Sequence, residues 1–371
     1  MAASLRPDWS GRLRLLSDYC EHERVGALVV STPANLRYLT GFAGSAGLVL
    51  VTPAEAFLIV DGRYSGEVSG AVADGALARV GVVKVDQRVD QSLADLIGRV
   101  GARRVGFEAA HVTVAMLAGW QKVTAGVEWV ATERVVERQR IVKDAFELGI
   151  LRDAAKRLST VARDLTKIVR GGQTERDAAR AIDLALEQAG FSEPAFPTIV
   201  ASGPNSAHPH AHPGERRLAA GDLVVLDFGG ILDGYCVDLT RSAVVGQASA
   251  RARALFEAVL DAQTAAIATV GAGVTGADVD AAARRVLDAR GLAEAFLHST
   301  GHGLGLEVHE APRLSPARSG PAEPLAAGMV CTIEPGAYLE GFAGVRLEDD
   351  VLVTADGCEV LTDAPRDLLV V

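Results

Sequence analysis

Four carboxylates in apolar surroundings are the residues of this 371-residue sequence that could support metal chemistry. Asp227 and Glu334 each end a largely apolar run, and Asp238 and Glu348 lie among apolar neighbours in the segments that follow. Burying several unpaired carboxylates together is prohibitive unless cations balance them. Oxygen-rich sites suit divalent ions such as Mn²⁺, Mg²⁺ or Zn²⁺. The pattern therefore predicts a divalent metal site, although a single aspartate at a strand end is more often a turn former.

Histidines gather in two segments and supply further candidate ligands. His208, His210 and His212 lie in ASGPNSAHPHAHPG, and three more histidines lie in HSTGHGLGLEVHEAP. His302 stands between two glycines, where the backbone can approach a ligand closely, and neutral imidazole is a normal metal ligand. His309 follows seven residues later and reaches the same site if the chain turns through the intervening glycines. His208 and His212 equally suit a solvated, Pro-rich loop, and HEAPR is not the HExxH motif of a helix-borne zinc site.

An internal repeat places these residues in two similar halves. LAAGDLVVLDFGG and LAAGMVCTIEPGA are related by an offset of 107 residues, and upstream GQTERD and GVTGAD are related by an offset of 101. Each half, approximately 145–245 and 250–355, is predicted to run helix, capped helix, loop with histidine, strand, turn, strand. We expect the halves to pack about a pseudo-twofold axis, with their equivalent strands meeting in one sheet.

The first part of the chain, 1–132, is predicted to be a separate α/β domain. Apolar runs bounded by Pro and Gly predict strands, and amphipathic patterns predict helices at 91–100 and 113–122. The predicted strands are 24–31, 47–52, 56–62, 80–85 and 104–108. The Gly-rich segment 33–47 is predicted to form turns. A long amphipathic helix over 135–170, with Glu147 on its polar side, is predicted to lead into the second domain, 133–371.

Composition and charge exclude several classes of protein. The hydrophobic content of 49% excludes disorder over most of the length. No apolar run approaches the roughly 20 residues of a membrane-spanning helix. A net charge of −10 makes nucleic acid an unsuitable partner. The N-terminal segment lacks a signal-peptide pattern and the four cysteines are scattered, so we expect a cytoplasmic protein with free thiols.

Several motifs in order resemble the pita-bread metallopeptidases, and among them the Xaa-Pro branch of aminopeptidase P and prolidase. These motifs are DFGGILDGYCVDLT, GHGLGLEVHE, IEPG and VRLEDD. Upstream, NLRYLTGFAGSAG and DGRY resemble the creatinase-type N-terminal domain that accompanies this branch. The resemblance implies an α+β protein, with an α/β N-terminal domain followed by a duplicated pita-bread catalytic domain of pseudo-twofold symmetry.

The resemblance also implies roles for individual residues. The implied metal ligands are Asp227, Asp238, His302, Glu334 and Glu348. They would hold two divalent ions, for which the family suggests Mn²⁺, with Zn²⁺ or Co²⁺ as alternatives. Because all five are present, the chain does not resemble creatinase, which lacks the metal set. The other implied site residues are His210 on the substrate side, His309 at the tetrahedral intermediate, His298 and Tyr235 in the pocket, and Arg346, which would neutralise the carboxylates.

The activity that the resemblance implies is release of an N-terminal residue from peptides with proline at the second position. A hydroxide bridging two metal ions would attack the scissile carbonyl, His309 would stabilise the oxyanion, and Glu334 would carry the proton to the prolyl nitrogen. The expected enzyme is an Xaa-Pro aminopeptidase, and the alternative is an Xaa-Pro dipeptidase (prolidase) restricted to dipeptides. A non-catalytic binding module on the same fold is the alternative of another class. The resemblance also implies a homodimer.

Overall fold

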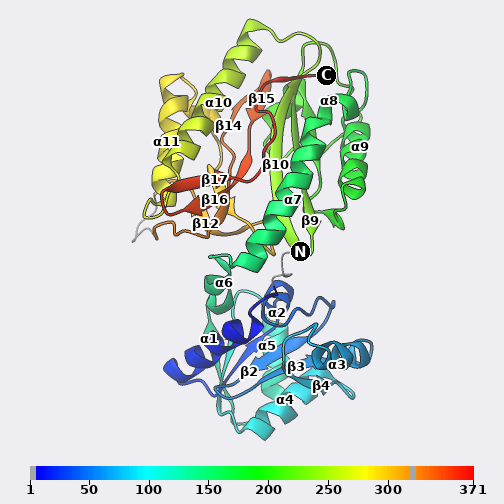
Figure 1. Ribbon diagram of the computed structural model, residues 1–371, viewed down its shortest axis with the longest axis vertical. Coiled ribbons are helices and arrows are strands. Elements are labelled where there is room, and N and C mark those ends of the chain that lie inside the picture. Colours follow the sequence, from blue (N-terminus) through cyan, green and yellow to red (C-terminus); the bar gives the residue numbers. More distant parts are fainter. Residues whose placement is uncertain (1–5, 318–322) are drawn as a thin grey trace. The chain divides into compact units, whose positions relative to one another are not determined.

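The computed structural model describes residues 6–317 and 323–371, which divide into two compact units (Figure 1). The N-terminal unit comprises Arg6–Arg140, and the C-terminal unit begins at Ile141 and runs to Val371. No helix within the described ranges is long and apolar enough to cross a membrane.

The N-terminal unit is the expected α/β domain, with one mixed sheet in the order β4-β3-β2-β1-β5-β6. Its strands are β1 (Ala27–Val30), β2 (Leu48–Val51), β3 (Ala56–Val60), β4 (Gly81–Lys84), β5 (Arg104–Glu108) and β6 (Glu128–Thr132). Its helices are α1 (Trp9–His22), α2 (Pro33–Thr40), α3 (Ser65–Ala73), α4 (Val89–Val100), α5 (Val114–Val123) and α6 (Val135–Arg140). Val29 and Leu50 pack in one core with residues of α4 and α5. Cys20 of α1 contacts the carbonyl oxygen of Val51.

The N-terminal unit ends at Arg140 and not at residue 132, where the sequence suggested the boundary, because it includes helix α6. The helix packs against α1 and α2, and its Val136 is buried. Asn35 of α2 donates to the carboxylate of Glu137 (2.7 Å) and accepts from Arg140 (2.7 Å). These polar contacts fix α6 to the N-terminal unit.

Helix α2 replaces turns that the sequence predicted in this segment. Pro33 stands in the first helical turn, where a missing N–H leaves no hydrogen bond unmade. Gly41 ends the helix in the left-handed conformation, with φ of 79°. Proline and glycine therefore mark the start and stop of a helix here.

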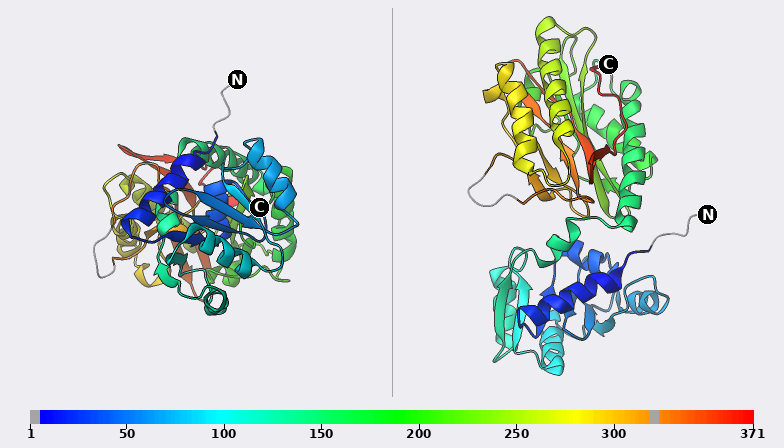
Figure 2. Two further views of the ribbon diagram at one scale, coloured as in Figure 1. Left: turned by 90° about the horizontal axis from the view of Figure 1, so that it is seen from below. Right: turned by 60° about the vertical axis from the view of Figure 1, so that its left-hand side comes forward.

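The C-terminal unit carries helices on two flanks with sheets between them (Figures 1 and 2). Its helices are α7 (Ala145–Arg163), α8 (Leu165–Ile168), α9 (Glu175–Gln188), α10 (Ala250–Thr269) and α11 (Gly276–Ala289), with 3₁₀ helices η1 (Gly203–Ala207) and η2 (Ala293–Ala295). Strands of the first half are β7 (Glu193–Pro194), β8 (Ile199–Ser202), β9 (Leu223–Leu232) and β10 (Tyr235–Val244). Those that follow are β11 (Gly301–Gly303), β12 (Glu310–Leu314), β13 (Val330–Ile333), β14 (Gly336–Leu339), β15 (Ala343–Arg346), β16 (Asp349–Thr354), β17 (Gly357–Val360) and β18 (Leu369–Val370).

The backbone repeats itself as the sequence predicted. Helices α9 and α11 each begin at a threonine N-cap. Just before them, Gly172 and Gly273 both adopt the left-handed conformation, with φ of 87° and 88°. The N–H of Gly172 donates to Leu218, and that of Gly273 donates to Leu325, each at 2.8 Å. The two halves thus share local hydrogen bonds as well as sequence.

The halves do not join in one sheet, contrary to expectation. Strands β9 and β10 lie in a sheet with β7, β8 and β18, whereas β13 and β16 lie in another with β11, β12 and β17. At the junction the N–H of Glu348 donates to the carbonyl oxygen of Thr240 (3.1 Å). The N–H of Asp238 donates to the carboxylate of Asp350 (3.0 Å). A side-chain carboxylate takes the place of a backbone carbonyl there, so the ladder is not continuous.

The predicted helix over 135–170 is interrupted between α6 and α7. Asp144 caps α7 in a reciprocal capping box with Glu147. Glu147 was expected on the polar side, but it is buried and accepts a hydrogen bond from Tyr235 (3.2 Å). The capping box therefore starts a new helix at a point where the amphipathic pattern of the sequence continues without a break.

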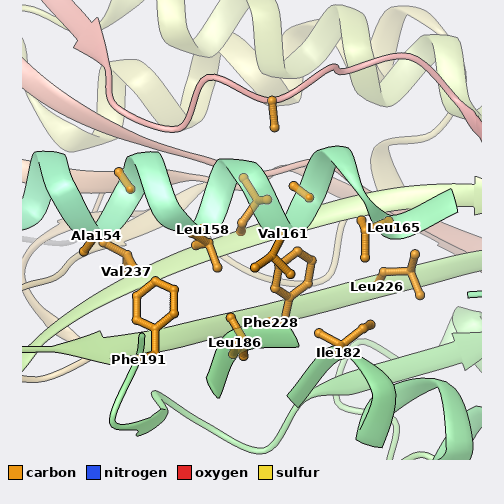
Figure 3. Close-up of a cluster of buried hydrophobic side chains, with 14 of the residues drawn as sticks. Ala154, Leu158, Val161, Leu165, Ile182, Leu186, Phe191, Leu226, Phe228 and Val237 are labelled. Atoms are coloured by element: carbon orange, nitrogen blue, oxygen red, sulfur yellow. The ribbon is translucent and has the colours of Figure 1, made fainter. Parts of the chain in front are cut away.

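One side of α7 packs on the first sheet and forms the core of this half (Figure 3). Leu158 and Val161 of α7 lie near Phe228 of β9, and Ile182 of α9 packs in the same cluster. This packing fixes β9 and β10, which carry two of the expected metal ligands.

Candidate metal centre

Strands β9 and β10 present three polar side chains on one face. Asp227 is paired with Thr240, and Asp238 is paired with Gly229. Paired residues share a face of the sheet, as do residues two apart on a strand. Asp227, Asp238 and Thr240 therefore point to the same side, and Gly229 leaves the space beside Asp238 open.

The second half presents Glu334 and Glu348 at a break in its ladder. Strands β13 and β16 are paired as far as Ile333 and Asp349, and β14 and β15 resume in the same register after Pro335. Proline has no N–H to donate and so interrupts the ladder. The register places Glu334 across from Glu348.

His302 of β11 completes the group. Its Nδ1 lies 3.0 Å from the carbonyl oxygen of Gly303. Its Nε2 makes no bond to that carbonyl and lies 3.4 Å from Oε1 of Glu334. Asp238, His302 and Glu348 each offer one ligand atom within 4.8 Å of the other two. Gly301 is required by packing, because a Cβ there would lie 1.9 Å from the carbonyl oxygen of Thr332. The glycine beside His302 thus serves close approach of two strands.

Burial sets the electrostatics of the carboxylates. It raises the pKa of Glu334 to about 7, although Arg346 acts to lower it. Burial first, and then mutual repulsion, raise the pKa of Asp238 and Glu348 well above the ordinary range. Among the described residues, Oδ1 of Asp227 and Oδ1 of Asp238 are buried without a hydrogen-bond partner. Orphaned carboxylate oxygens beside one imidazole fit divalent metal ions, which would supply the missing positive charge.

Arg346 lies where the sequence placed it, against the carboxylates. Its Nη2 forms an ion pair with Asp227, and its Nε donates to Thr240 (3.3 Å). Its Nη1 donates to the hydroxyl of Tyr338 (2.7 Å) and to the carbonyl oxygen of Pro209 (3.3 Å). One buried guanidinium therefore connects both halves and the loop that precedes His210.

Tyr338 is a site residue that the sequence did not indicate. Its hydroxyl lies 2.8 Å from Nε2 of His298, whose Nδ1 lies 2.8 Å from the carbonyl oxygen of Ser299. The carbonyl requires Nδ1 to donate, so Nε2 accepts from the tyrosine. Burial lowers the pKa of His298 to about 4, which agrees with a neutral ring. A chain of donors therefore runs from Arg346 through Tyr338 to His298.

Tyr235, expected in the pocket, lies in the core between α7 and the first sheet. Its side chain packs in that apolar cluster and donates to Glu147. Tyr338 is the tyrosine that touches Arg346 and His298. Tyr338 lies four residues after Glu334 and belongs to no motif or periodic pattern from which the sequence could have identified it.

The remaining histidines lie at the edge of the carboxylate group. The ring of His309 meets that of His302 edge-on, with centroids 4.4 Å apart, and burial lowers the pKa of His309. His210 is exposed, and its charge acts to lower the pKa of both His298 and His309. His208 and His212 are also exposed on the His210 loop. The structure thus brings together the five expected ligands with His210, His298, His309 and Arg346.

Comparisons with known proteins agree with this arrangement. Residues 149–355 match the metallopeptidase family M24, and residues 12–142 match the creatinase/prolidase N-terminal domain. The chain is 32% identical to an Xaa-Pro dipeptidase of Pyrococcus furiosus, over 96% of this chain and 99% of that protein. It superposes on an Xaa-Pro dipeptidase from Bacillus anthracis with a TM-score of 0.93 and 32% identity, covering 98% of this chain and 100% of the other. An X-Pro aminopeptidase from Thermotoga maritima gives a TM-score of 0.87 and 31% identity, with 95% and 100% covered.

The duplicated C-terminal unit and the α/β N-terminal unit correspond to these two matches. The matches confirm the pita-bread and creatinase-type resemblance that the motifs suggested. A buried carboxylate group that can hold a divalent ion is consistent with metal-dependent hydrolysis. The chain is a hydrolase that belongs to the metallopeptidase family M24, with a creatinase/prolidase N-terminal domain.

Proposed function

We propose that this enzyme is an Xaa-Pro dipeptidase, which hydrolyses the bond between the two residues of a dipeptide ending in proline. The sequence alone put the aminopeptidase first, but relatives from Pyrococcus furiosus and Bacillus anthracis named Xaa-Pro dipeptidase favour the alternative. A dipeptidase must recognise the free carboxylate of the prolyl residue, so the proposal requires a cation beside the site.

The proposal is supported by the position and exposure of Arg313. It pairs with His302 across the β11–β12 ladder, its side chain is exposed, and its charge acts to lower the pKa of His302 and His309. No hydrogen bond or ion pair engages its side chain among the residues described in the structure. A guanidinium free beside the site histidines can bind a carboxylate through two parallel hydrogen bonds.

We further propose that Asp227, Asp238, His302, Glu334 and Glu348 hold two divalent ions, with Mn²⁺ as the first candidate. When bound, the ions would polarise the scissile carbonyl and lower the pKa of the attacking water. Glu334 accepts the proton of that water and passes it to the prolyl nitrogen, and its carboxylate lies 3.4 Å from Nε2 of His302 within the ligand group. His309 donates to the developing oxyanion, and Arg346 forms an ion pair with Asp227.

Parallel assays on Gly-Pro and on a tripeptide with proline at the second position test the proposal. We expect Gly-Pro to be the better substrate, and Arg313→Gln to raise KM for Gly-Pro by about 10- to 100-fold, the range for a lost charged hydrogen-bond pair. Arg253→Gln is the matched control, because Arg253 is an exposed arginine of α10. Equal or faster cleavage of the tripeptide, unaffected by Arg313→Gln, would favour the aminopeptidase. The X-Pro aminopeptidase from Thermotoga maritima supports that second candidate.

We retain the homodimer as a proposal. Light scattering of the metal-loaded protein at assay concentration tests it, and a mass near the 38.7 kDa of one chain would contradict it.

A further inference from the structure

The loop 203–214, which carries His210, follows β8 and contains no strand. In the second half, by contrast, His302 is held by the β11–β12 and β11–β13 ladders. Ladder hydrogen bonds fix a side chain through its own backbone. Within the His210 loop the backbone forms local turns, such as the bond from His208 N–H to Asn205 (3.0 Å), and at its end Gly214 accepts from the N–H of Arg176 in α9 (3.1 Å). Something other than a sheet must therefore set the position of His210.

Glu175, the first residue of α9, supplies that anchor from a fully buried position. Its Oε1 accepts from the N–H of Ser202 (2.8 Å), from the hydroxyl of Ser202 (2.7 Å) and from the amide of Asn205 (3.1 Å). Its Oε2 accepts from Asn205 (3.2 Å) and from the N–H of Gly214 (3.2 Å). One carboxylate thus binds the entry and the exit of the loop together.

A guanidinium lies close to the Glu175 carboxylate. Arg216 donates to the hydroxyl of Ser202 (2.6 Å), which in turn donates to Glu175. The ion pair of Arg216 is with Asp222 (2.5 Å) and is the main cause of the raised pKa of Arg216, and the carboxylate of Glu175 acts in the same direction. A buried carboxylate that accepts five hydrogen bonds near a guanidinium is a rigid anchor, and breaking it would leave several buried donors unpaired.

The repeat shows why this anchor exists in the first half only. At the offset of 101 residues, Gly276 corresponds to Glu175. A Cβ on Gly276 would lie 2.2 Å from the carbonyl oxygen of Arg313, so the backbone of β12 occupies that space. Strand β12 fills the position in one half, and the Glu175 carboxylate with its loop fills it in the other.

The far side of the loop contacts β15, the strand that carries Arg346. Gly344 N–H donates to Ser206 Oγ (2.8 Å), and Arg346 donates to the carbonyl oxygen of Pro209 (3.3 Å). His210 is the next residue after Pro209. The loop is therefore held between Glu175 on one side and Arg346 on the other, with His210 at the Arg346 side.

We propose that Glu175 is a positioning residue for the peptidase reaction, which acts by holding the loop that presents His210 to the substrate. The inference rests on the proposed function, because His210 has a role on the substrate side only if the enzyme is an Xaa-Pro peptidase, as the family resemblance implies. Glu175→Gln tests it with almost no change in volume. The Gln carbonyl can still accept from Ser202, but its NH₂ group would face the donors of Asn205 and Gly214.

The first measurement is hydrogen exchange of the peptide 203–214 in the metal-loaded protein, which needs no substrate. We expect exchange about tenfold faster in Glu175→Gln, from the loss of roughly one net hydrogen bond. Glu187→Gln, an exposed acid on the same helix, is the control and should exchange as the wild type does. Unchanged exchange in Glu175→Gln would overturn the inference even if the enzyme is a dipeptidase.

The second measurement is a double-mutant cycle of Glu175→Gln with His210→Ala on Gly-Pro. Misplacing His210 should lower kcat/KM by about 10- to 100-fold in Glu175→Gln, with bound metal unchanged. The double variant should be no slower than His210→Ala alone, because the anchor acts through that histidine. Losses that multiply would show that Glu175 acts elsewhere and would overturn the inference.

Two further arms keep the test decisive. If Glu175→Gln folds poorly, Asn205→Ala removes part of the same anchor while Ser202 and Gly214 still satisfy the carboxylate. It should give a smaller change in the same direction, and no change would count against the anchor. If wild-type enzyme cleaves only the tripeptide, the dipeptidase proposal fails, and the same cycle is run on the tripeptide.

Discussion

Removing metal should make the stability of the C-terminal unit fall as pH rises. Burial raises the pKa of Glu334 from 4.5 to about 7 in the metal-free protein. Between these values the folded state holds a proton that the unfolded state has released, so unfolding becomes easier with rising pH. A shift of this size corresponds to about 3 kcal/mol, reached by about pH 8 and absent below about pH 4. Asp238 and Glu348 shift in the same direction and add to the loss.

Urea unfolding of chelated and Mn²⁺-loaded protein at pH 5.5, 6.5 and 8 measures this effect. Circular dichroism at 222 nm follows both units, because both contain helices. Trp9, Trp120 and Trp129 all belong to the N-terminal unit, so their fluorescence follows that unit by itself. We expect the ellipticity midpoint of the chelated protein to fall as pH rises, and metal to abolish that fall by binding the folded state. The fluorescence midpoint is the internal control.

Glu334→Gln isolates the contribution of that carboxylate. The amide does not titrate, so the metal-free variant should be more stable than the metal-free wild type at pH 8, by up to about 3 kcal/mol. At pH 5.5 the difference should be much smaller. A chelated wild type that is equally stable at pH 5.5 and pH 8 would refute the reasoning, as would a pH dependence that Glu334→Gln leaves unchanged.

Three further substitutions test the residues around the centre. Arg346→Gln leaves the buried carboxylate of Asp227 without its cation and should destabilise the metal-free protein by about 3–5 kcal/mol in urea, with a smaller loss once metal is bound. Tyr338→Phe removes the hydroxyl between Arg346 and His298 and should lower kcat about tenfold with unchanged metal content by elemental analysis. Asp280→Ala leaves the N–H of buried Thr300 unpaired and should cost about 1–3 kcal/mol of unfolding free energy, whereas the exposed Asp288→Ala should change it little.

The repeat is the reason that the carboxylates could be predicted from sequence. Asp227 and Glu334 recur at one offset within apolar strands, and each strand is also held by a recurring glycine turn. Buried acids at equivalent positions of two halves need a common explanation, and a shared ligand supplies it. The structure brings these residues together, with His302 among them.

Residues that act through long-range hydrogen bonds could not be predicted in this way, because no sequence pattern marks them. Glu175 lies in the first turn of a helix, where acidic residues are common, yet its carboxylate reaches Asn205 and Gly214, 30 and 39 residues away. Glu147 follows the polar pattern of α7 but is buried and accepts a hydrogen bond from Tyr235. Helical periodicity reports which side of a helix faces solvent on average. It does not report which polar side chain finds a buried partner.

The backbone N–H groups of Glu334 and Glu348 connect the two halves and the histidine strand. In the ladder that pairs these two residues, Val353 N–H donates to Met329 (2.8 Å) and Leu347 N–H donates to Pro335 (3.4 Å). Because hydrogen-bonded and non-hydrogen-bonded pairs alternate in an antiparallel ladder, the N–H groups of Glu334 and Glu348 point away from each other. That of Glu348 donates to Thr240 of the first half (3.1 Å), and that of Glu334 donates to Thr300, two residues before His302 (2.7 Å). The antiparallel register therefore turns the backbone of each glutamate toward a strand or segment that carries another expected ligand.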